Sequence, residues 1–382
     1  MTVKVPLKET ALNAERIARI ARELQGSCSE FDADRFVRDV MADLPRLELK
    51  DRIARTSAAL HAHLPVTGVE ALEILLRSLP PTPEAAGVTN DFGLHIYSPH
   101  SDYVARYFRT AEHLDQALDA LARLTCYFSA ELAARDFLTD FPDETMKIVH
   151  AWARDEDHRV RRLASEATRP RLPWVPRVRL PADAALPILD QLYADASPYV
   201  RTSVANHLHD LSIEQPQLVL STLQRWQNSA RATDKDFTSL ARQALRSRLK
   251  EGWPAAYAFL GYAHGAPIEL TPVALKHTEL RDGGTLSFSA DLTTTTTAPV
   301  HVMYVISSTT KTGKPREKAY FLLRGTAQPG RELRLSKDHV LRSTATVKLV
   351  PGEYSIALQI NGRRFPPGGF PRPGGMTNCP CP

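Results

Sequence analysis

The sequence contains little cysteine, and its cysteines form no recognisable metal-binding or disulfide pattern. They include no CxxC pair and have no histidine partner at metal-ligand spacing, and the four are Cys28, Cys126, Cys379 and Cys381. His207 and His209 are two residues apart, so on a helix they point to different sides and do not form the i, i+4 pair of a metalloprotease. We therefore expect no metal site, no disulfide scaffold and residence in the cytosol.

Long apolar runs and the common nucleotide-binding and hydrolase motifs are also missing. No run of about 18 uninterrupted apolar residues occurs, and the N-terminal segment MTVKVPLKETALNAERIARIARELQ is charged throughout, without the apolar region of a signal peptide. There is no GxSxG, P-loop or GxGxxG sequence, which excludes the commonest hydrolase, NTPase and dinucleotide-binding classes. We expect no export, no membrane association and no cofactor.

The charges that are present are distributed unevenly along the chain. The 382 residues have a formal net charge of +5, but residues 262–382 carry 15 Lys and Arg against 8 Asp and Glu, whereas the preceding part carries 33 against 35. The positive excess is therefore C-terminal. A basic balance of this size is a mild indication of a polyanionic partner.

The first part of the chain, residues 1–140, shows the pattern of amphipathic helices. Apolar residues recur at helical spacing with charged residues between them, and the expected helices are Asn13–Gln25, Asp32–Leu44, Leu47–His61, Val69–Leu79, Asp102–Arg109 and Leu114–Leu132. This region is predicted to be all-α.

Residues 141–261 repeat themselves. VRRLA at 160–164 aligns with VRTSV at 200–204, and LARQA follows at 240–244, so the blocks recur at one constant interval. Each block is preceded by a further helical pattern. Helix pairs at a period of about 40 residues are typical of HEAT-like repeats, which stack into a solenoid with a concave binding face.

The composition then changes to short alternating segments rich in β-branched and aromatic residues. TLSFSADL, VHVMYVIS, KAYFLLRG, TATVKLV and YSIALQING predict five to seven strands within residues 262–365. The sequence thus predicts a mainly α protein: a HEAT-like α-solenoid followed by an immunoglobulin-like β-sandwich without the antibody cysteine pair. Residues 366–382, rich in proline and glycine, are expected to be a flexible tail.

The stretch RVRRLASEATRPRLPWVPRVR, residues 159–179, carries the strongest chemical signal. It contains seven arginines with one acid, Glu166, and one tryptophan, Trp174. Such a density of arginine suits contacts to DNA phosphates, and we expect this role for Arg162, Arg169 and Arg171, and for Arg201 one repeat later. Glu166 could instead be a structural ion-pair partner, and Trp174 could fill a core.

A second acid-bearing stretch, SVANHLHDL, stands one repeat later and includes Asp210. Equivalent helices of neighbouring repeats lie side by side, so Glu166 and Asp210 could converge on one face. Asp210 could equally interact with a helix terminus. A third carboxylate, Glu131 in CYFSAEL, precedes the repeats. In the sandwich, Lys314 and Arg316 lie in the basic hairpin TTKTGKPREK and are expected to contact DNA.

Several of these motifs resemble one known family. RRLASEATRPRLPW, the later YVRTSVANHLHDL, the earlier RLTCYFSAEL and the closing PGEYSIALQING are similar to the AlkC-type branch of the bacterial HEAT-repeat alkylpurine DNA glycosylases. The resemblance implies base excision repair: hydrolysis of the N-glycosidic bond of a cationic alkylated base in double-stranded DNA, such as 3-methyladenine or 3-methylcytosine, by a protein we expect to be monomeric.

The resemblance also assigns roles to residues. It implies that Glu166, Asp210, Glu131 and Trp174 surround the damaged nucleotide. The carboxylates would stabilise an oxocarbenium-like sugar and orient water, because a cationic base needs no general acid to leave. In IYSPHSDYVARY the Pro-His pair is similar to a family loop that presses on the duplex, which implies that His100 is a wedge. The alternative is that His100 is a surface histidine with its hydrogen bonds satisfied.

Two other classes of function remain open. A non-catalytic HEAT-repeat scaffold for DNA or protein would use the same arginines for binding and the carboxylates only to space its repeats. A processing enzyme for another nucleic acid, such as RNA, is the third possibility. Release of free methylated base from methylated duplex DNA would separate an enzyme from a scaffold.

Overall fold

The computed structural model describes residues 5–173, 175–277, 281–344 and 348–372, with side chains as far as residue 369. The chain divides into two compact units: unit 1 is Met1–Leu211 with Ser229–Gln243, and unit 2 is Ser212–Asn228 with Ala244–Pro382. The expected boundaries near residues 140 and 261 therefore do not separate compact units. The helices on either side of residue 140 continue in one unit.

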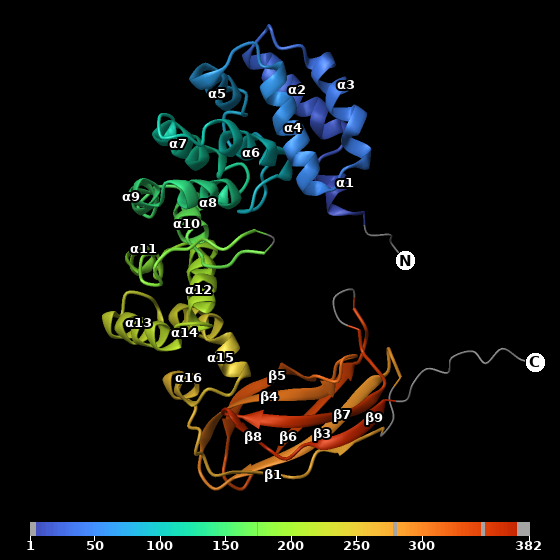
Figure 1. Cartoon of the computed structure of the whole chain (residues 1–382). Helices are drawn as coiled ribbons and strands as arrows, with labels where there is room; N and C mark the ends of the chain where they lie inside the picture. The colour runs from blue at the N-terminus through green and yellow to red at the C-terminus, as the bar shows by residue number, and fades with distance from the viewer. Residues whose placement is uncertain (1–4, 174, 278–280, 345–347, 373–382) are drawn as a thin grey trace, which may run out of the picture. The chain divides into compact units, whose positions relative to one another are not determined.

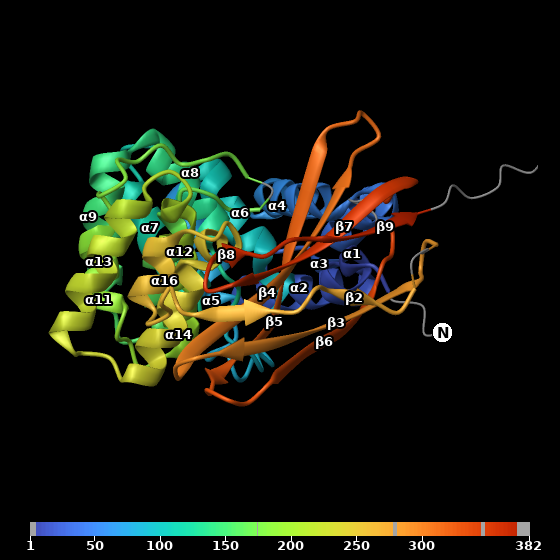
Figure 2. The same ribbon diagram turned by 90° about the horizontal axis from the view of Figure 1, so that it is seen from below.

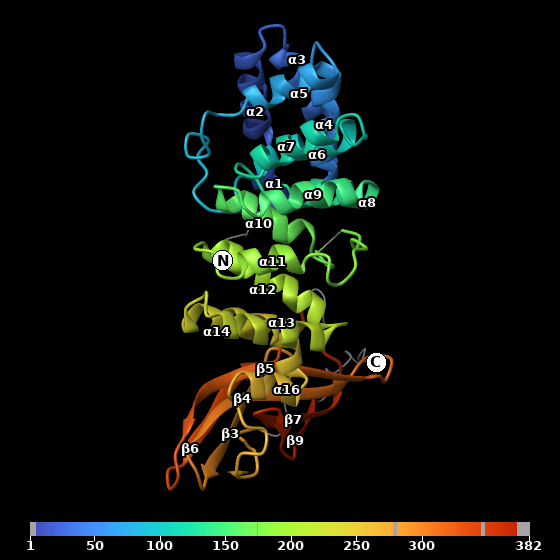
Figure 3. The same ribbon diagram turned by 90° about the vertical axis from the view of Figure 1, so that its left-hand side faces the viewer.

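Unit 1 is helical, as the periodicity predicts. Its helices are α1 (Leu7–Ala11), α2 (Ala14–Ser27), α3 (Ala33–Asp43), α4 (Leu49–His63), α5 (Gly68–Arg77), α6 (Ser98–Tyr107), α7 (Leu114–Leu124), α8 (Glu131–Asp140), α9 (Pro142–Trp152), α10 (His158–Ala167), α11 (Leu186–Leu192), α12 (Pro198–Ser212) and α14 (Asp234–Ala244), with short 3-10 helices η1 (Leu44–Arg46) and η2 (His95–Tyr97). Polar side chains begin several of them: Asn13, Asp32 and Asp157 accept a hydrogen bond from the first turn of α2, α3 and α10. Figure 1 shows their order, and in Figure 3 α8 to α12 follow one another in layers.

The expected helix Leu114–Leu132 is wrong in one respect, because α7 ends at Leu124 and α8 begins only at Glu131. Between them the backbone pairs with an earlier loop: Leu94 N donates to Tyr127 O at 2.8 Å, and Ser129 N donates to Phe92 O at 3.2 Å. Gly93, with φ of +86°, allows this close approach, since a Cβ there would lie 2.1 Å from the Tyr127 oxygen. The pairing places Ser129 at the start of α8.

The repeats share an arginine that links each repeat to the next. Arg161 Nη1 donates to two backbone carbonyls in the turn before its own helix, and its Nε and Nη2 donate to the carboxylate of Asp195. Arg201 makes equivalent bonds one repeat later, with two carbonyls of its own turn and with Asp236. The repeat period read from the sequence is therefore confirmed in the side-chain contacts.

Unit 2 contains two antiparallel sheets packed face to face, shown in Figures 1 and 2. One sheet holds β1 (Ile268–Leu270), β3 (Thr285–Thr294), β2 (Ala274–Leu275) and β6 (Leu333–Val340); the other holds β5 (Pro315–Ala327), β4 (Ala298–Thr309), β7 (Gly352–Ile360), β8 (Arg363–Arg364) and β9 (Gly368–Arg372). Residues from both sheets form one apolar core. Within it the rings of Phe288 and Tyr304 lie 5.1 Å apart.

Unit 2 also takes in helices that were expected to belong to the repeats. These are most of α13 (Pro216–Ser229), α15 (Arg246–Lys250) and α16 (Pro254–Phe259). The buried amide of Gln359 on β7 explains the association of α15 and α16 with the sheets, because it donates to Leu249 O at 2.9 Å and to the Tyr257 hydroxyl at 3.2 Å. Near residue 261 the secondary structure therefore changes from helix to strand, but the compact unit continues across this position.

The strand predictions are confirmed for β3, β4, β5 and β7, but two details of the C-terminal region are wrong. TATVKLV was expected to be a strand; residues 345–347 lie outside the described residues and 348–350 are not in a strand, whereas the unpredicted β6 pairs with β3. The tail was expected to begin at residue 366, yet β9 pairs with β7. No helix in the described ranges has the length and apolarity that crossing a bilayer requires.

Candidate active site

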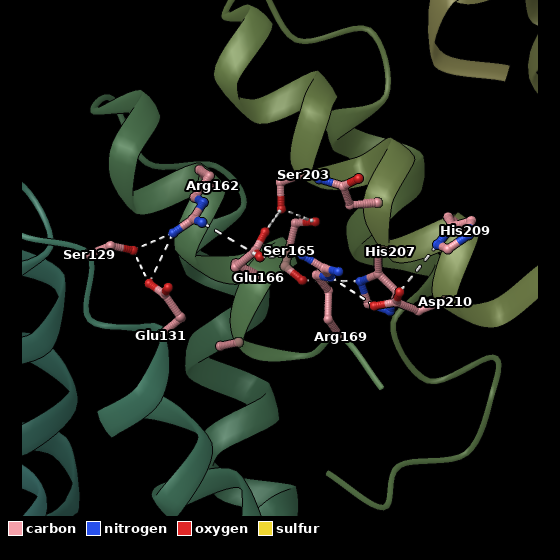
Figure 4. Close-up of polar contacts among 12 residues, drawn as sticks. Ser129, Glu131, Arg162, Ser165, Glu166, Arg169, Ser203, His207, His209 and Asp210 are labelled. Carbon is pink, nitrogen blue, oxygen red and sulfur yellow. Dashed lines mark hydrogen bonds and ion pairs between the residues drawn. The ribbon is translucent and has the colours of Figure 1, made fainter. Parts of the chain in front are cut away.

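Three carboxylates that the sequence singled out lie together in unit 1, as Figure 4 shows. Glu131 begins α8, Glu166 is in the last turn of α10, and Asp210 is near the end of α12. Their side chains are 13%, 6% and 7% exposed. The expected convergence of Glu166 and Asp210 is therefore present in the structure, and it occurs in a largely buried setting.

Two arginines connect these carboxylates into a row of alternating charges. Arg162 Nη1 lies 3.0 Å from Glu131 Oε2, and its Nη2 lies 3.6 Å from Glu166 Oε1. Arg169 Nη1 lies 2.5 Å from the same oxygen of Glu166, and its Nε lies 2.9 Å from Asp210 Oδ2. We call Glu131, Arg162, Glu166, Arg169 and Asp210 the charge row. It holds three carboxylates against two guanidinium groups, so its own balance is negative.

Hydroxyl groups complete the row. Ser203 on α12 donates to Glu166 Oε2 at 2.6 Å, which ties the acid of one repeat to the equivalent helix of the next. Ser129 donates to Glu131 and accepts from Arg162. Each hydroxyl supplies a hydrogen bond that a buried carboxylate needs in order to stay ionised without water.

The electrostatics of the row favour ionised acids. Burial by itself would raise the pKa of Glu166, but the positive charges of Arg162 and Arg169 outweigh it and hold this pKa below its ordinary value. Burial opposes ionisation of Asp210 too, and the neighbouring side chains of His209 and Arg169 hold its pKa below its ordinary value. Both acids therefore carry negative charge at neutral pH. Such groups suit stabilisation of a cation better than donation of a proton.

Sequence reasoning did not find Arg135 on α8. Its guanidinium is buried and binds three backbone carbonyls, with Nη1 donating to Arg169 O at 2.6 Å and to Ala167 O at 3.2 Å, and Nη2 donating to Pro176 O at 3.0 Å. It therefore ends α10 and fixes the backbone from which Arg169 extends. The only signal in the sequence is one arginine among the apolar residues of ELAARDFLTD.

In the sequence, His207 stood out only as a possible metal ligand. It is buried on α12, and its Nδ1 lies 3.1 Å from the carbonyl oxygen of Ser165. Because a carbonyl only accepts, Nδ1 carries the proton, and burial lowers the pKa of His207 to about 4. A neutral His207 thus links α12 to the turn that carries Glu166. Within the described residues, no group of three or more His, Cys, Asp or Glu could hold a metal ion.

Three arginines that were expected to bind phosphate have other partners. Arg162 and Arg169 lie within the charge row, and Arg201 bridges two repeats through Asp236. The sequence could not reveal this, because their acidic partners come from other helices. Arg171 is partly exposed, and its role in DNA binding stays a prediction.

The other expected contacts differ in accessibility. Lys314 is exposed and Arg316 partly exposed on the β4–β5 hairpin, so both are accessible to a ligand. His100 is not: it lies within α6, its side chain is 1% exposed, and burial lowers its pKa to about 4. The assignment of His100 as an exposed wedge is therefore wrong for this structure. Trp174 lies outside the described residues.

The whole chain resembles a protein of known structure. It is similar to the alkylpurine DNA glycosylase AlkC of Pseudomonas fluorescens, whose structure was solved bound to DNA containing an abasic site analogue: the chains are 30% identical, the match covers 97% of this chain and 100% of that chain, and the TM-score is 0.87. This chain belongs to the AlkC family. The resemblance read from the motifs is thus confirmed.

A further relative carries no assigned activity. The uncharacterized protein YhaZ of Bacillus subtilis (strain 168) is 29% identical to this chain over 354 residues, which is 92% of this chain and 95% of that protein. The family model for the C-terminal Ig-like domain of uncharacterised protein YhaZ matches residues 269–371. This match confirms the immunoglobulin-like fold of the sandwich.

Proposed function

We propose that this protein is a DNA glycosylase of base excision repair, which hydrolyses the N-glycosidic bond of cationic alkylated bases in double-stranded DNA, with 3-methyladenine and 3-methylcytosine as substrates. Membership of the AlkC family supports the reaction class. The observation that carries the proposal is the charge row, because three carboxylates converge there and Glu166 and Asp210 are held ionised. Action on chromosomal DNA would place the protein in the bacterial cytosol or nucleoid.

The proposed reaction uses negative charge and positioned water. The bond between C1′ and the base nitrogen breaks with both electrons going to the base, which loses its positive charge as the sugar becomes oxocarbenium-like. Water then bonds to C1′ and releases one proton to solvent. Glu166 and Asp210 stabilise the sugar cation and orient the water, with Glu131 extending the negative surface, because ionised groups fixed in a water-poor site interact strongly with developing charge.

Residues outside the charge row would also contact the substrate. Trp174 would stack on the sugar or on the cationic base, a contact that the ring quadrupole favours. Arg171, Lys314 and Arg316 would contact DNA phosphates, and the protein would act as a monomer. Arg162 and Arg169 would act through the carboxylates that they hold.

The deciding experiment measures free base released from methylated duplex DNA by the purified protein. We expect 3-methyladenine and 3-methylcytosine to appear with matching numbers of abasic sites. Binding of the duplex without base release would favour the scaffold hypothesis, and release confined to methylated RNA would favour the third class. The variant Glu166→Gln, purified in parallel, shows whether any release comes from a contaminating enzyme.

A further inference from the structure

Unit 1 contains a pocket of about 420 Å³ that no predicted role explains, lined in part by α1, by α2 and by Leu94. Arg16, Arg19 and Arg22 lie three residues apart on α2, and this spacing places them on one face of the helix. None of the described residues that line the pocket is aromatic, so these residues offer no surface on which a base could stack. Its chemistry is that of an anion site.

The three arginines are not equivalent. Arg19 is engaged: it donates to Glu23 at 2.8 Å, to the carbonyl of Ala86 at 2.9 Å and to the Tyr97 hydroxyl at 2.8 Å, and so it builds the pocket wall. Arg16 and Arg22 have no side-chain hydrogen bond or ion pair to any described part of the chain. Their guanidinium groups are therefore available to a ligand.

Two acids line the pocket and set its charge. Glu9 is neutralised by Arg52, whose Nη2 lies 2.6 Å from Glu9 Oε1. Glu15 remains as one carboxylate beside the two available guanidinium groups of Arg16 and Arg22. The pocket therefore keeps a positive balance, and planar guanidinium groups match the paired oxygens of a phosphate.

The pocket is joined to the charge row by a short stretch of backbone. Leu94, which lines it, donates its backbone N–H to Tyr127 O at 2.8 Å, and two residues further along Ser129 contacts both Glu131 and Arg162. A duplex held at the charge row extends in both directions, and its backbone carries a phosphate at every nucleotide. We propose that Arg16 and Arg22 bind backbone phosphates of this duplex, outside the damaged nucleotide.

This inference rests on the proposed function only in assuming that the protein binds duplex DNA. Three arginines expected to bind phosphate form ion pairs with acids elsewhere in unit 1, so a bound duplex needs other cationic partners for its phosphates. A phosphate site contributes affinity and register without chemistry. Loss of Arg16 and Arg22 should therefore weaken duplex binding and leave the rate of base release at saturating protein unaltered.

The test compares Arg16→Gln/Arg22→Gln with a matched control, Arg35→Gln/Arg38→Gln, which removes two exposed arginines of α3 outside the pocket. Binding of undamaged duplex is measured against salt concentration. Removing one phosphate-binding group lowers the slope of log K against log salt by about 0.9, so the pocket variant should show close to twice that change, whereas the control should show little. The variant Glu15→Gln should bind severalfold more tightly, because it removes the one opposing charge.

Equal changes of slope in the pocket and control variants would overturn the inference, because they would reflect net charge alone. It would also be overturned if the pocket bound inorganic phosphate while the slope for duplex stayed at the wild-type value. Base release by the wild-type protein is measured separately. If the wild-type protein releases base and the pocket variant keeps the wild-type salt slope, only the inference is contradicted. If the wild-type protein binds duplex but releases no base, only the proposed function is contradicted.

Discussion

Arg169 Nε and Asp210 Oδ2 lie 2.9 Å apart, and this ion pair joins the segment after α10 to α12 of the next repeat. Nη1 of the same guanidinium contacts Glu166. One side chain therefore sets the separation of the two proposed catalytic acids. It also neutralises part of their mutual repulsion, which allows both to stay ionised although they are buried.

The first prediction concerns these two acids. Glu166→Gln and Asp210→Asn keep shape and hydrogen-bonding capacity but remove charge, so each should reduce single-turnover release of 3-methyladenine by about 10²–10³. Affinity for an abasic-site duplex should change far less. Ser203→Ala is the matched control: it removes the 2.6 Å hydrogen bond to Glu166 and leaves the charge in place, so its rate should fall by only about tenfold.

Melting curves distinguish catalysis from packing in these variants. Removing one partner of a buried pair also destabilises, by up to about 3–5 kcal/mol. If base release at a temperature where each variant is folded equals that of wild type, the acids are structural members of the repeats and the proposed mechanism is wrong.

The second prediction concerns Arg135. Arg135→Lys keeps the charge but cannot reach three carbonyls at once, so the backbone that carries Arg169 should loosen and base release should fall by about ten- to a hundredfold. Arg161→Lys is the matched control, since Arg161 also binds backbone carbonyls and an acid but is outside the charge row. Both variants should melt earlier than wild type. A rate loss of the same size in both would mean that Arg135 has only a general structural role.

The third prediction concerns the pH dependence of stability. Burial lowers the pKa of His100 from 6.5 to about 4, and Nδ1 of its ring has no hydrogen-bond partner in the described structure. Because the unfolded chain binds the proton more readily, the stabilising contribution of neutral His100 is complete above pH 6.5 and is lost as pH falls towards 4. The loss amounts to about 3 kcal/mol.

His100→Leu should therefore flatten the fall of unfolding free energy between pH 6.5 and 4, as measured by urea titration. The remaining pH dependence of the unfolding free energy should come from His207, whose pKa is also lowered to about 4. If His100→Leu kept the wild-type dependence of unfolding free energy on pH, His100 would not take up a proton on unfolding in this range. Duplex binding near neutral pH should be unchanged, since a buried His100 does not contact DNA.

The fourth prediction concerns the β4–β5 hairpin. Lys314→Gln/Arg316→Gln should weaken duplex binding and lower its salt slope by about 0.9 for each phosphate released, with the rate at saturation unchanged. Lys337→Gln on β6 is a control, because this lysine is exposed on the other sheet. Substitution is preferable to deletion of the sandwich here, since unit 2 includes residues 212–228 and a cut at residue 262 would divide it. Wild-type binding in the double variant would show that the hairpin does not contact DNA.

The sequence by itself determined the element types and the repeat. Apolar spacing predicted the helices because helix formation depends on local periodicity, and the constant repeat interval reappears in the bonds of Arg161 and Arg201. Alternation predicted four of the long strands. It did not predict β6, whose sequence LRLSKDHV includes the exposed charged residues Arg334, Lys337 and Asp338 and becomes a strand by pairing with β3.

The residue types of the site were likewise visible in the sequence, since a lone Glu166 among arginines and an acid one repeat later are local observations. Only the tertiary structure decided what the arginines do. Arg162 and Arg169 meet acids that come from separate helices, and Arg135 meets carbonyls that are distant from it in the sequence. The burial of His100 has the same origin, because it depends on which helices cover α6. The ion pairs and the burial of these side chains depend on packing between segments that are distant in the sequence. The periodicity of one segment does not show which other segments pack against it.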